Sequence, residues 1–364
     1  MNFFMPVRLF TGENCVADSL PGQLPAAKSC LIVTGSHSAV SCGALADVVS
    51  VLTASGVGYT VFDGITANPR VSDCIAAGSA ASSAGAGFVI GIGGGSAMDA
   101  AKAVSVFAAN PGMDEDRFYS ADWPHSPLPL ILVGTTAGTG SEVTKVSVLT
   151  DKKGRKHSIH DDKLYAAASF GDPGYTLSLP EKVTLSTGID VLTHCAESWF
   201  SKKATAVSRA CAAEGIRMLM SPLSAAAEGK ELTPSQRAEL YDASIMGGLA
   251  ICVTGTCFPH NLGYYLTESF GVPHGFACAA FFPELLEHAE RAVPGYAGEL
   301  YKSAGVTAEK LLELTASVLP GFDFKIDAEE LERALPRWEN NGSVKNTVGD
   351  VTLSDIRRYF EKFM

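Results

Sequence analysis

An aspartate and a histidine stand four residues apart in DVLTHCAESW, residues 190–199. On a helix, Asp190 and His194 leave the same face one turn apart, so both side chains can reach one metal ion. An isolated pair of this kind usually belongs to an ordinary amphipathic helix, and a metal site needs more ligands. FPHNLGYYLTESFGVPHG, residues 258–275, offers His260 and His274 in largely apolar surroundings. An imidazole placed there needs a partner, and a cation can be that partner.

One aspartate and three histidines form a set of three nitrogens and one oxygen. Such a set suits Fe(II) or Zn(II), and without thiolate it does not resemble a structural cysteine-based zinc site. The nine cysteines contain no C-x-x-C pair and are expected to be reduced interior thiols. Four of them lie in the second half of the chain near the proposed ligands. We expect these to be buried structural thiols, with metal ligation as the lesser alternative: Cys195, Cys252, Cys257 and Cys278.

One glycine-rich segment and one hydroxyl-rich segment each follow a strand-like run. GIGGGSAMDAAKA, residues 91–103, opens a helix, and its glycines let backbone N–H groups approach an anion, with Ser96 expected to cap the helix. Its spacing is not G-x-G-x-x-G, so a plain tight turn stays open as an alternative. GTTAGTGSE, residues 134–142, carries hydroxyl donors at Thr135, Thr136, Thr139 and Ser141. Two such loops at strand ends of one domain favour nucleotide binding.

The elements that must position these residues change in character along the chain. Strand-like and helix-like stretches alternate up to about residue 136, which predicts parallel strands with crossover helices in a Rossmann-like α/β domain. Beyond residue 181, long helical periods predict an all-α domain, with helices over 185–202, 206–220 and 234–252. The proline and glycine cluster at 171–180 marks the boundary, so we expect domains of 1–177 and 178–364.

Composition excludes several function classes. The chain has 364 residues, 46% of them hydrophobic, and no apolar run long enough to cross a bilayer. A net charge of -11 argues against nucleic acid and anionic membranes as partners. No export signal is visible, so we expect a cytoplasmic location.

Four segments in matching order give the chain a family resemblance: GIGGGSAMDAAKA, TTAGTGSEVT, STGIDVLTHCAES and FPHNLGYYL followed by VPHG. Together they resemble the iron-containing (group III) alcohol dehydrogenases over nearly the whole chain. The resemblance implies a dehydroquinate synthase-like architecture, an α/β dinucleotide-binding domain and a helical domain, with metal and substrate in the cleft between them. It implies Asp190, His194, His260 and His274 as metal ligands, with Glu197 supporting them or serving a structural role. It also implies that Gly94, Gly95 and Ser96 hold the pyrophosphate, and that further residues line the cofactor cleft: Asn68, Asp99, Lys102, Thr135, Thr136, Thr139, Ser141 and Lys156.

Two departures from the family pattern matter. Relatives that prefer NAD often carry an acidic residue just after the first strand of the dinucleotide domain, whereas Gly35, Ser36, His37 and Ser38 stand here. With no carboxylate to repel a 2′-phosphate, we expect NADP(H) as coenzyme, with NAD(H) tolerated. Many relatives also carry a histidine four residues after the third ligand as a proton relay, and this chain has Tyr264. Tyrosine or ordered water would then carry the proton.

The function these features favour is a metal-dependent, NAD(P)-linked alcohol dehydrogenase that acts mainly as an aldehyde reductase on a small substrate. The sequences of several segments are similar to those of a branch that includes phosphonoacetaldehyde reductases. This similarity implies a short anionic aldehyde as substrate. Cationic contacts could come from Lys145, Lys156, His157 and His160, although a solvated loop explains them equally well. Two alternatives are a metal-dependent lyase or cyclase of the dehydroquinate synthase type and a non-catalytic nucleotide sensor. Family members imply a homodimer or a larger homo-oligomer.

Overall fold

The computed structural model describes residues 3–364, which fall into two compact units. The first unit runs to Pro180 and also includes Thr233–Tyr241. The second unit comprises Glu181–Leu232 and Asp242–Met364. The return of residues 233–241 to the first unit has no counterpart in the sequence pattern, because those residues begin an otherwise continuous helix, α9 (Pro234–Thr254).

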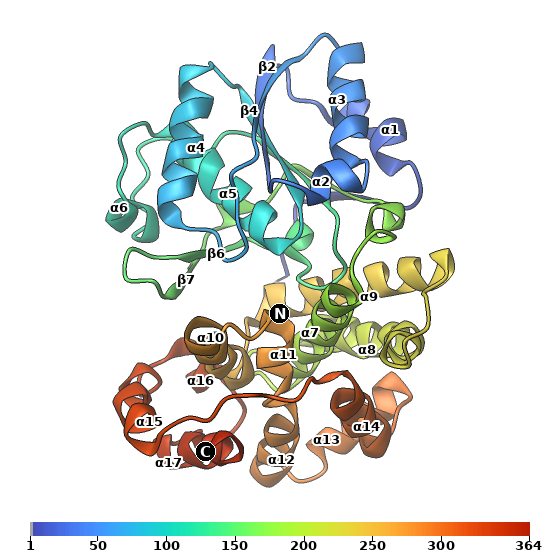
Figure 1. Ribbon diagram of the computed structural model, residues 1–364, viewed down its shortest axis with the longest axis vertical. Coiled ribbons are helices and arrows are strands. Elements are labelled where there is room, and N and C mark those ends of the chain that lie inside the picture. Colours follow the sequence, from blue (N-terminus) through green and yellow to red (C-terminus); the bar gives the residue numbers. More distant parts are fainter. Residues whose placement is uncertain (1–2) are drawn as a thin grey trace. The chain divides into compact units, whose positions relative to one another are not determined.

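A six-stranded parallel sheet organises the first unit (Figure 1). Its spatial order is β1-β8-β5-β4-β2-β3, and every neighbouring pair is parallel. The strands are β1 (Arg8–Thr11), β2 (Ser29–Thr34), β3 (Gly58–Phe62), β4 (Phe88–Gly93), β5 (Leu130–Gly134) and β8 (Ala168–Gly171). A separate antiparallel hairpin joins β6 (Val146–Thr150) to β7 (Lys156–His160).

Helices cover both faces of this sheet. One face packs through Ile32, Ile90 and Phe170 against α1 (Cys15–Ser19), α2 (Ser38–Ser41) and α3 (Ala44–Ala54). Successive strand residues point to opposite faces of the sheet. The residues that alternate with Ile32, Ile90 and Phe170 therefore face α5 (Gly95–Ala109), which packs beside α4 (Val71–Ser83). Gly91 permits this contact, since a Cβ there would lie 2.5 Å from the Cβ of Ala101. A short helix, α6 (Glu115–Tyr119), follows.

The strand order places the glycine-rich turn at a special point of the sheet. The chain passes from β2 outward to β3 and then returns to the other side of β2 as β4. Parallel sheets leave a crevice at the carboxyl ends of strands where the order reverses in this way, and ligands bind there. The turn after β4 therefore lies at the ligand-binding edge although β4 is not the first strand.

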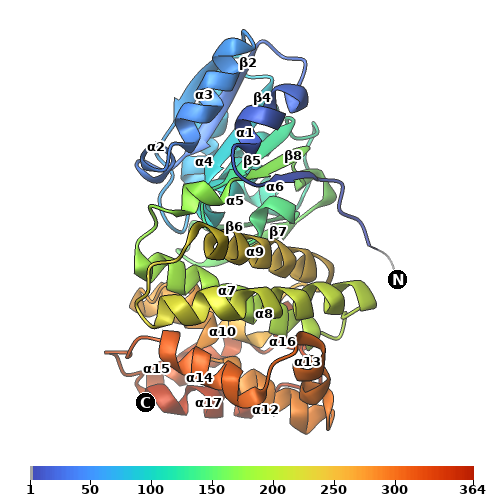
Figure 2. The same cartoon turned by 90° about the vertical axis from the view of Figure 1, so that its right-hand side faces the viewer.

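The second unit consists of helices and includes the later part of α9 (Figure 2). At its centre, α7 (Glu181–Trp199) is buried at every residue from Gly188 to Trp199 and packs against α8 (Ala206–Ala227). The remaining helices are α10 (Phe258–Phe270), α11 (His274–Ala279), α12 (Phe282–Ala292), α13 (Tyr296–Ala304), α14 (Ala308–Val318), α15 (Ala328–Ala334), α16 (Gly342–Asn346) and α17 (Leu353–Phe360).

Among residues 3–364, no single helix is both long and apolar enough to cross a membrane. The pair α9 and α10 passes that test together by length and composition, but the two helices are bent by 110° at the break between them.

Candidate functional site

Three ionisable side chains line one face of α7. Asp190, His194 and Glu197 occupy positions i, i+4 and i+7, which share a face of a helix. All three are buried, Glu197 completely. A buried carboxylate is stable only beside a cation or several hydrogen-bond donors, so this face needs one or the other.

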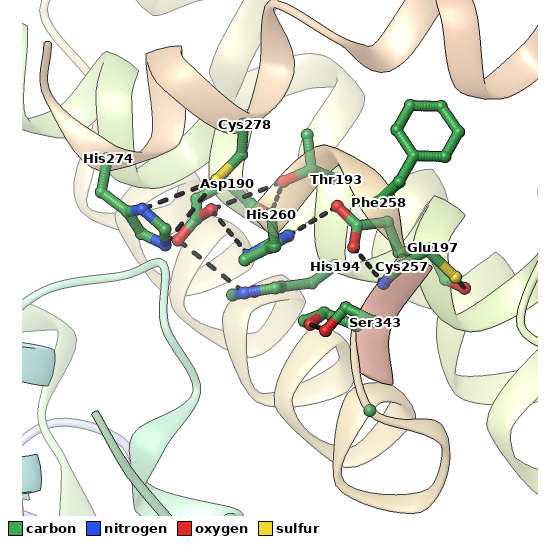
Figure 3. A network of polar contacts seen from close by, with 12 residues as sticks. Asp190, Thr193, His194, Glu197, Cys257, Phe258, His260, His274, Cys278 and Ser343 are labelled. Carbon is green, nitrogen blue, oxygen red and sulfur yellow. Dashed lines mark hydrogen bonds and ion pairs between the residues drawn. The ribbon is translucent and has the colours of Figure 1, made fainter. Parts of the chain in front are cut away.

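Two further helices bring the remaining histidines to this face (Figure 3). His260 lies in the first turn of α10 and His274 is the first residue of α11. Glycines allow the close approach: a Cβ on Gly275 would lie 1.8 Å from the carbonyl oxygen of Ser186 on α7, and a Cβ on Gly263 would lie 2.8 Å from the backbone nitrogen of Cys278. Gly275 in VPHG and Gly263 in NLG thus allow α7, α10 and α11 to pack closely.

The donor atoms converge at spacings that suit one ion. Asp190 Oδ1 lies 3.5 Å from His260 Nε2, and Asp190 Oδ2 lies 3.9 Å from His194 Nε2. Two donors bound to one tetrahedral ion at ordinary lengths lie roughly 3.3–3.8 Å apart. The ring centroids of His194 and His260 are 4.6 Å apart, and those of His260 and His274 are 5.2 Å apart. The four ligands expected from the sequence therefore gather at one place.

The tightest group of donors has a different membership from the expected set. One ligand atom from each of Asp190, His260, His274 and Cys278 lies within 4.8 Å of the others, and this group does not include His194. Cys278 Sγ is 3.5 Å from Nδ1 and 3.8 Å from Nε2 of His274. The sequence favours Cys278 as a structural thiol, with metal ligation as the lesser alternative. Its spacing of four residues from His274 was the available signal, because i and i+4 share a helix face.

Glu197 fixes the orientation of His260. Its Oε1 lies 2.5 Å from His260 Nδ1, and its Oε2 accepts a hydrogen bond of 2.5 Å from the backbone N–H of Cys257. With Nδ1 engaged by a carboxylate, Nε2 faces the other donors as a potential ligand, an arrangement typical of histidines that bind metals. His260 Nε2 is buried and has no hydrogen-bond partner among residues 3–364. A buried nitrogen left in this state fits a site built for a cation.

The ionisable groups of this cluster have shifted pKa values. Burial raises the pKa of Asp190, but the neighbouring His194, His274 and His260 outweigh burial and hold that pKa below its ordinary value. Burial lowers the pKa of His260, but Cys278, Glu197 and Asp190 outweigh it and raise that pKa well above its ordinary value. Burial raises the pKa of Glu197 despite its contact with His260. These opposite shifts reflect the close mutual contact of buried carboxylate and imidazole groups.

Tyr264 lies beside this cluster. Its ring stacks on that of His274, with centroids 5.5 Å apart and an interplanar angle of 23°. It is half-buried on α10, one turn after His260. The structure therefore places this hydroxyl-bearing side chain next to a proposed ligand.

In the first unit, the two strand-following loops pack against each other. A Cβ on Gly94 would lie 2.9 Å from the side chain of Thr136, and one on Gly95 would lie 2.6 Å from Thr139. Glycine is thus needed for loop packing as well as for access of an anion to backbone N–H groups. The expectation that Ser96 caps the helix is wrong: α5 begins at Gly95, its N-cap is Gly94, and no side chain caps it. Ser96 stands one residue too far into the helix to do so.

A buried lysine network lies beneath these loops. Lys102 is fully buried and donates to Ser141 Oγ at 2.6 Å, Thr144 Oγ1 at 3.1 Å and the carbonyl of Val146 at 2.8 Å. Asp99 accepts from Ser141 Oγ at 2.6 Å and pairs with Lys102 at 3.3 Å. These polar atoms are engaged with one another, so they hold the second loop and β6 against α5.

Glu142 anchors the same loop from the other side. It is completely buried and accepts a 2.6 Å hydrogen bond from the Tyr241 hydroxyl. Burial raises the pKa of this carboxyl group. Gly134 and Gly171 leave room for the pair, because a Cβ on either would lie about 2 Å from it. Sequence reasoning missed this role, since no pattern links positions 142 and 241.

The other residues expected at the cofactor lie around the carboxyl edge of the sheet. Gly35 directly follows β2, and Ser36 and Ser38 are exposed. Thr135 directly follows β5, and its buried Oγ1 has no hydrogen-bond partner in the described part of the chain. Asn68 adopts a left-handed conformation with φ of 56° and accepts from Thr150 Oγ1 through its carbonyl oxygen. Lys156 begins β7.

The cationic side chains of the hairpin are largely engaged with neighbours. Lys145 pairs with Asp162 at 2.6 Å. The His157 ring stacks on that of Tyr119 with centroids 3.9 Å apart, and His160 contacts Ser158. Of these side chains, Lys145 has its positive charge paired with a carboxylate.

Two family models match nearly the whole chain. The iron-containing alcohol dehydrogenase model covers residues 6–173, and the C-terminal model of the Fe-containing alcohol dehydrogenase family covers residues 184–327. Alcohol dehydrogenase 4 of Saccharomyces cerevisiae strain YJM789 is 30% identical over 290 residues, or 78% of this chain and 75% of that protein.

Solved structures agree over the full length. An iron-containing alcohol dehydrogenase of Thermotoga maritima has a TM-score of 0.91 and 32% identity, with 99% of this chain and 98% of that chain covered. The sulfoacetaldehyde reductase of Bifidobacterium kashiwanohense, crystallised with NAD+, has a TM-score of 0.89 and 26% identity, with 100% and 98% covered.

Proposed function

The chain belongs to the iron-containing alcohol dehydrogenase family, and from that premise we propose that it is a metal-dependent NAD(P)-linked enzyme that reduces small aldehydes and oxidises the matching alcohols. The observation that carries the proposal is the convergence of Asp190, His194, His260 and His274 in the second unit.

These four residues would hold a divalent ion, Fe(II) in the first instance and Zn(II) as the alternative. Three imidazoles and one carboxylate are donors that both ions accept, and the buried, unpartnered Nε2 of His260 is an observation of this chain that fits. When bound, such an ion polarises a carbonyl and lowers the pKa of an alcohol. Around it, Glu197 holds the His260 ring and Tyr264 is the candidate to move a proton to or from the substrate oxygen.

A nicotinamide coenzyme would supply or accept the hydride. The turn formed by Gly94, Gly95 and Ser96 lies at the switch point of the sheet and at the amino end of α5, where the helix dipole favours an anion. Thr135 directly follows β5, and its buried Oγ1 has no hydrogen-bond partner among residues 3–364. The hydrogen-bond network around Lys102 would hold these loops in position.

We infer a preference for NADP(H), with NAD(H) tolerated. The residues after β2 are Gly35, Ser36 and Ser38, which are uncharged and leave a 2′-phosphate without a repelling carboxylate. That one relative was crystallised with NAD+ supports the coenzyme class in general.

The substrate we propose is a short aldehyde with an anionic group, such as phosphonoacetaldehyde. Support comes from the similarity to a sulfoacetaldehyde reductase, since sulfonate and phosphonate are tetrahedral anions of similar size. The lyase or cyclase alternative is not favoured, because the matching families and the relatives named above are dehydrogenases or reductases.

The test is oxidation of NADPH and NADH by the Fe(II)-reconstituted protein with a panel of neutral and anionic short aldehydes. We expect faster turnover with NADPH and with phosphonoacetaldehyde or sulfoacetaldehyde than with propanal. Preference for propanal would overturn the substrate proposal alone, and preference for NADH would overturn the coenzyme proposal. No turnover with any aldehyde by a metal-loaded protein would overturn the proposed function.

A further inference from the structure

The first turn of α10, which carries His260, is not capped by a side chain of its own. The N-cap residue is Cys257, and its side chain accepts no hydrogen bond from the helix. The first backbone N–H groups of a helix have no acceptor within that helix, so other parts of the protein must supply one. The N–H groups of Cys257 and Phe258 belong to this set, and both residues are completely buried. Water therefore cannot replace the missing acceptors.

Two other segments supply the acceptors. Glu197 on α7 accepts from the N–H of Cys257 through Oε2, while its Oε1 contacts the ring of His260 (Figure 3). Thr347 Oγ1 accepts from the N–H of Phe258 at 3.1 Å, across 89 positions of sequence. Thr347 directly follows α16 and is completely buried. Its hydroxyl thus takes the part of the N-terminal cap that α10 lacks.

Thr347 is itself held in a defined orientation. Its hydroxyl donates to the carbonyl oxygen of Ser343 at 3.2 Å, which leaves an oxygen lone pair for the N–H of α10. Its backbone forms an isolated antiparallel bridge with Ser201, and the N–H of Val348 donates to the carbonyl oxygen of Phe200 at 2.8 Å. Phe200 directly follows α7. The position of Thr347 is therefore tied to the helix that carries two of the proposed metal ligands.

Asn346, the last residue of α16, holds the segment that leads into α10. Its Nδ2 donates to the carbonyl oxygens of Thr254 and Thr256 at 2.9 and 3.0 Å. Its Oδ1 accepts from Ser201 Oγ at 2.9 Å, and the side chain is buried. These contacts fix the break between α9 and α10, where the two helices are bent by 110°. The neighbouring residues 346 and 347 thus hold both the approach to α10 and its first turn.

We propose that Thr347, with Asn346, is a positioning residue for the metal ligand His260. This inference rests on the proposed metal-dependent function. Without the Thr347 hydroxyl, the buried N–H of Phe258 has no acceptor, and the first turn of α10 can regain one only by moving. His260 lies in that turn, so its Nε2 would move relative to Asp190 Oδ1, from which it is 3.5 Å away. Weaker metal binding follows.

The test compares the Fe(II) affinity of the full-length parent and three variants, measured without oxygen by competition with a coloured chelator. Thr347→Val replaces the hydroxyl by a methyl group, and Thr347→Ser keeps the hydroxyl. Thr315→Val is the matched control, because Thr315 is also buried and its hydroxyl donates to the carbonyl oxygen of Leu311 within α14. We expect Thr347→Val to bind Fe(II) roughly tenfold more weakly than the parent. Thr347→Ser and Thr315→Val should bind it like the parent.

A merely structural role of the hydroxyl predicts a different pattern. The two valine variants would then lose Fe(II) affinity together, through general destabilisation, or neither would lose it. Either result would overturn the proposal, and so would a loss in Thr347→Ser as large as that in Thr347→Val. In these cases the metal-dependent function would still stand. A parent that binds no Fe(II) would instead refute the metal centre on which the inference rests.

If Thr347→Val does not fold, hydrogen exchange of the parent decides. Mass spectrometry of the peptide that contains Phe258 should show equal protection of its amide with and without Fe(II), because Thr347 holds the turn before the ion binds. Protection that arises only with bound Fe(II) would overturn the proposal, since the ion would then order the turn.

Discussion

At the scale of single residues, the proposed metal centre depends on the side chains that position its proposed ligands as well as on those ligands. Asp190, His194, His260 and His274 could be named from the sequence, because their spacing and the family pattern identify them. The position of Cys278, four residues after His274, indicates a shared helix face, but the direction in which its buried thiol points emerges only from packing. The contact between Glu197 and His260 joins residues 63 positions apart and likewise emerges only from packing.

Replacement of Glu197 by glutamine should weaken metal binding without removing a ligand. An amide cannot match the carboxylate that accepts from His260 Nδ1, so we expect metal affinity to fall about 10- to 100-fold. Metal titration of the chelated protein measures this. Glu214→Gln, at a surface carboxylate of α8, serves as control and should bind metal like the parent. Equal affinities in both variants would show that Glu197 does not position His260.

Replacement of Tyr264 by phenylalanine should slow the chemical step and leave metal content unchanged. The ring contact with His274 is kept while the hydroxyl is lost, and removal of a proton-transferring group typically costs roughly 100-fold in kcat. The pH profile of kcat should lose the corresponding limb. Tyr265→Phe is the matched control, because the Tyr265 hydroxyl donates to Glu330 at 2.9 Å. If both variants retain parental kcat, water carries the proton.

At the scale of elements, helix and strand types could be predicted where periodicity is strong. β2, β4 and β5 are buried apolar runs, and α7, α8 and α9 show long helical periods. β1 and β8 have four residues each and could not be recognised, because so short a run carries little pattern. The hairpin of β6 and β7 was not predicted either: β6 alternates regularly between half-buried and buried residues but β7 does not.

The turn after β2 should set the coenzyme preference. Ser36→Asp places a carboxylate at an exposed position of this turn and should raise KM for NADPH by roughly tenfold or more relative to NADH. Gly35 is a poorer choice, because a Cβ there would lie 3.1 Å from the carbonyl oxygen of Ile65. Ser41→Asp adds the same charge at the end of α2 and controls for net charge. An unchanged ratio in Ser36→Asp would place the ribose elsewhere.

Close contact between α11 and α7 should be necessary for the centre. Gly275→Ala would put a Cβ 1.8 Å from the carbonyl oxygen of Ser186, so the helices must separate and we expect a loss of about 2 kcal/mol or more in unfolding free energy. Metal content should fall with it. Gly298→Ala on α13 meets no atom within 4 Å and should be neutral or stabilising by up to about 1 kcal/mol. Similar denaturation midpoints for both variants would contradict this account.

At the scale of the whole molecule, the alternation of strands and helices followed by helices alone predicts an α/β unit and a helical unit. The return of Thr233–Tyr241 to the first unit was not predictable, because its residues continue a regular helix. Each unit carries one part of the proposed function: the loops at the switch point of the sheet in the first, and the donor cluster in the second.

The most direct test of the central claim is a titration of the chelated, full-length protein with Fe(II), in which bound metal and aldehyde reduction are measured on the same samples. We predict that turnover is absent after chelation, rises in proportion to bound metal, and reaches its limit at one ion per chain. His260→Ala should neither retain the ion nor recover activity. Full turnover by the metal-free parent, or by His260→Ala, would contradict the account.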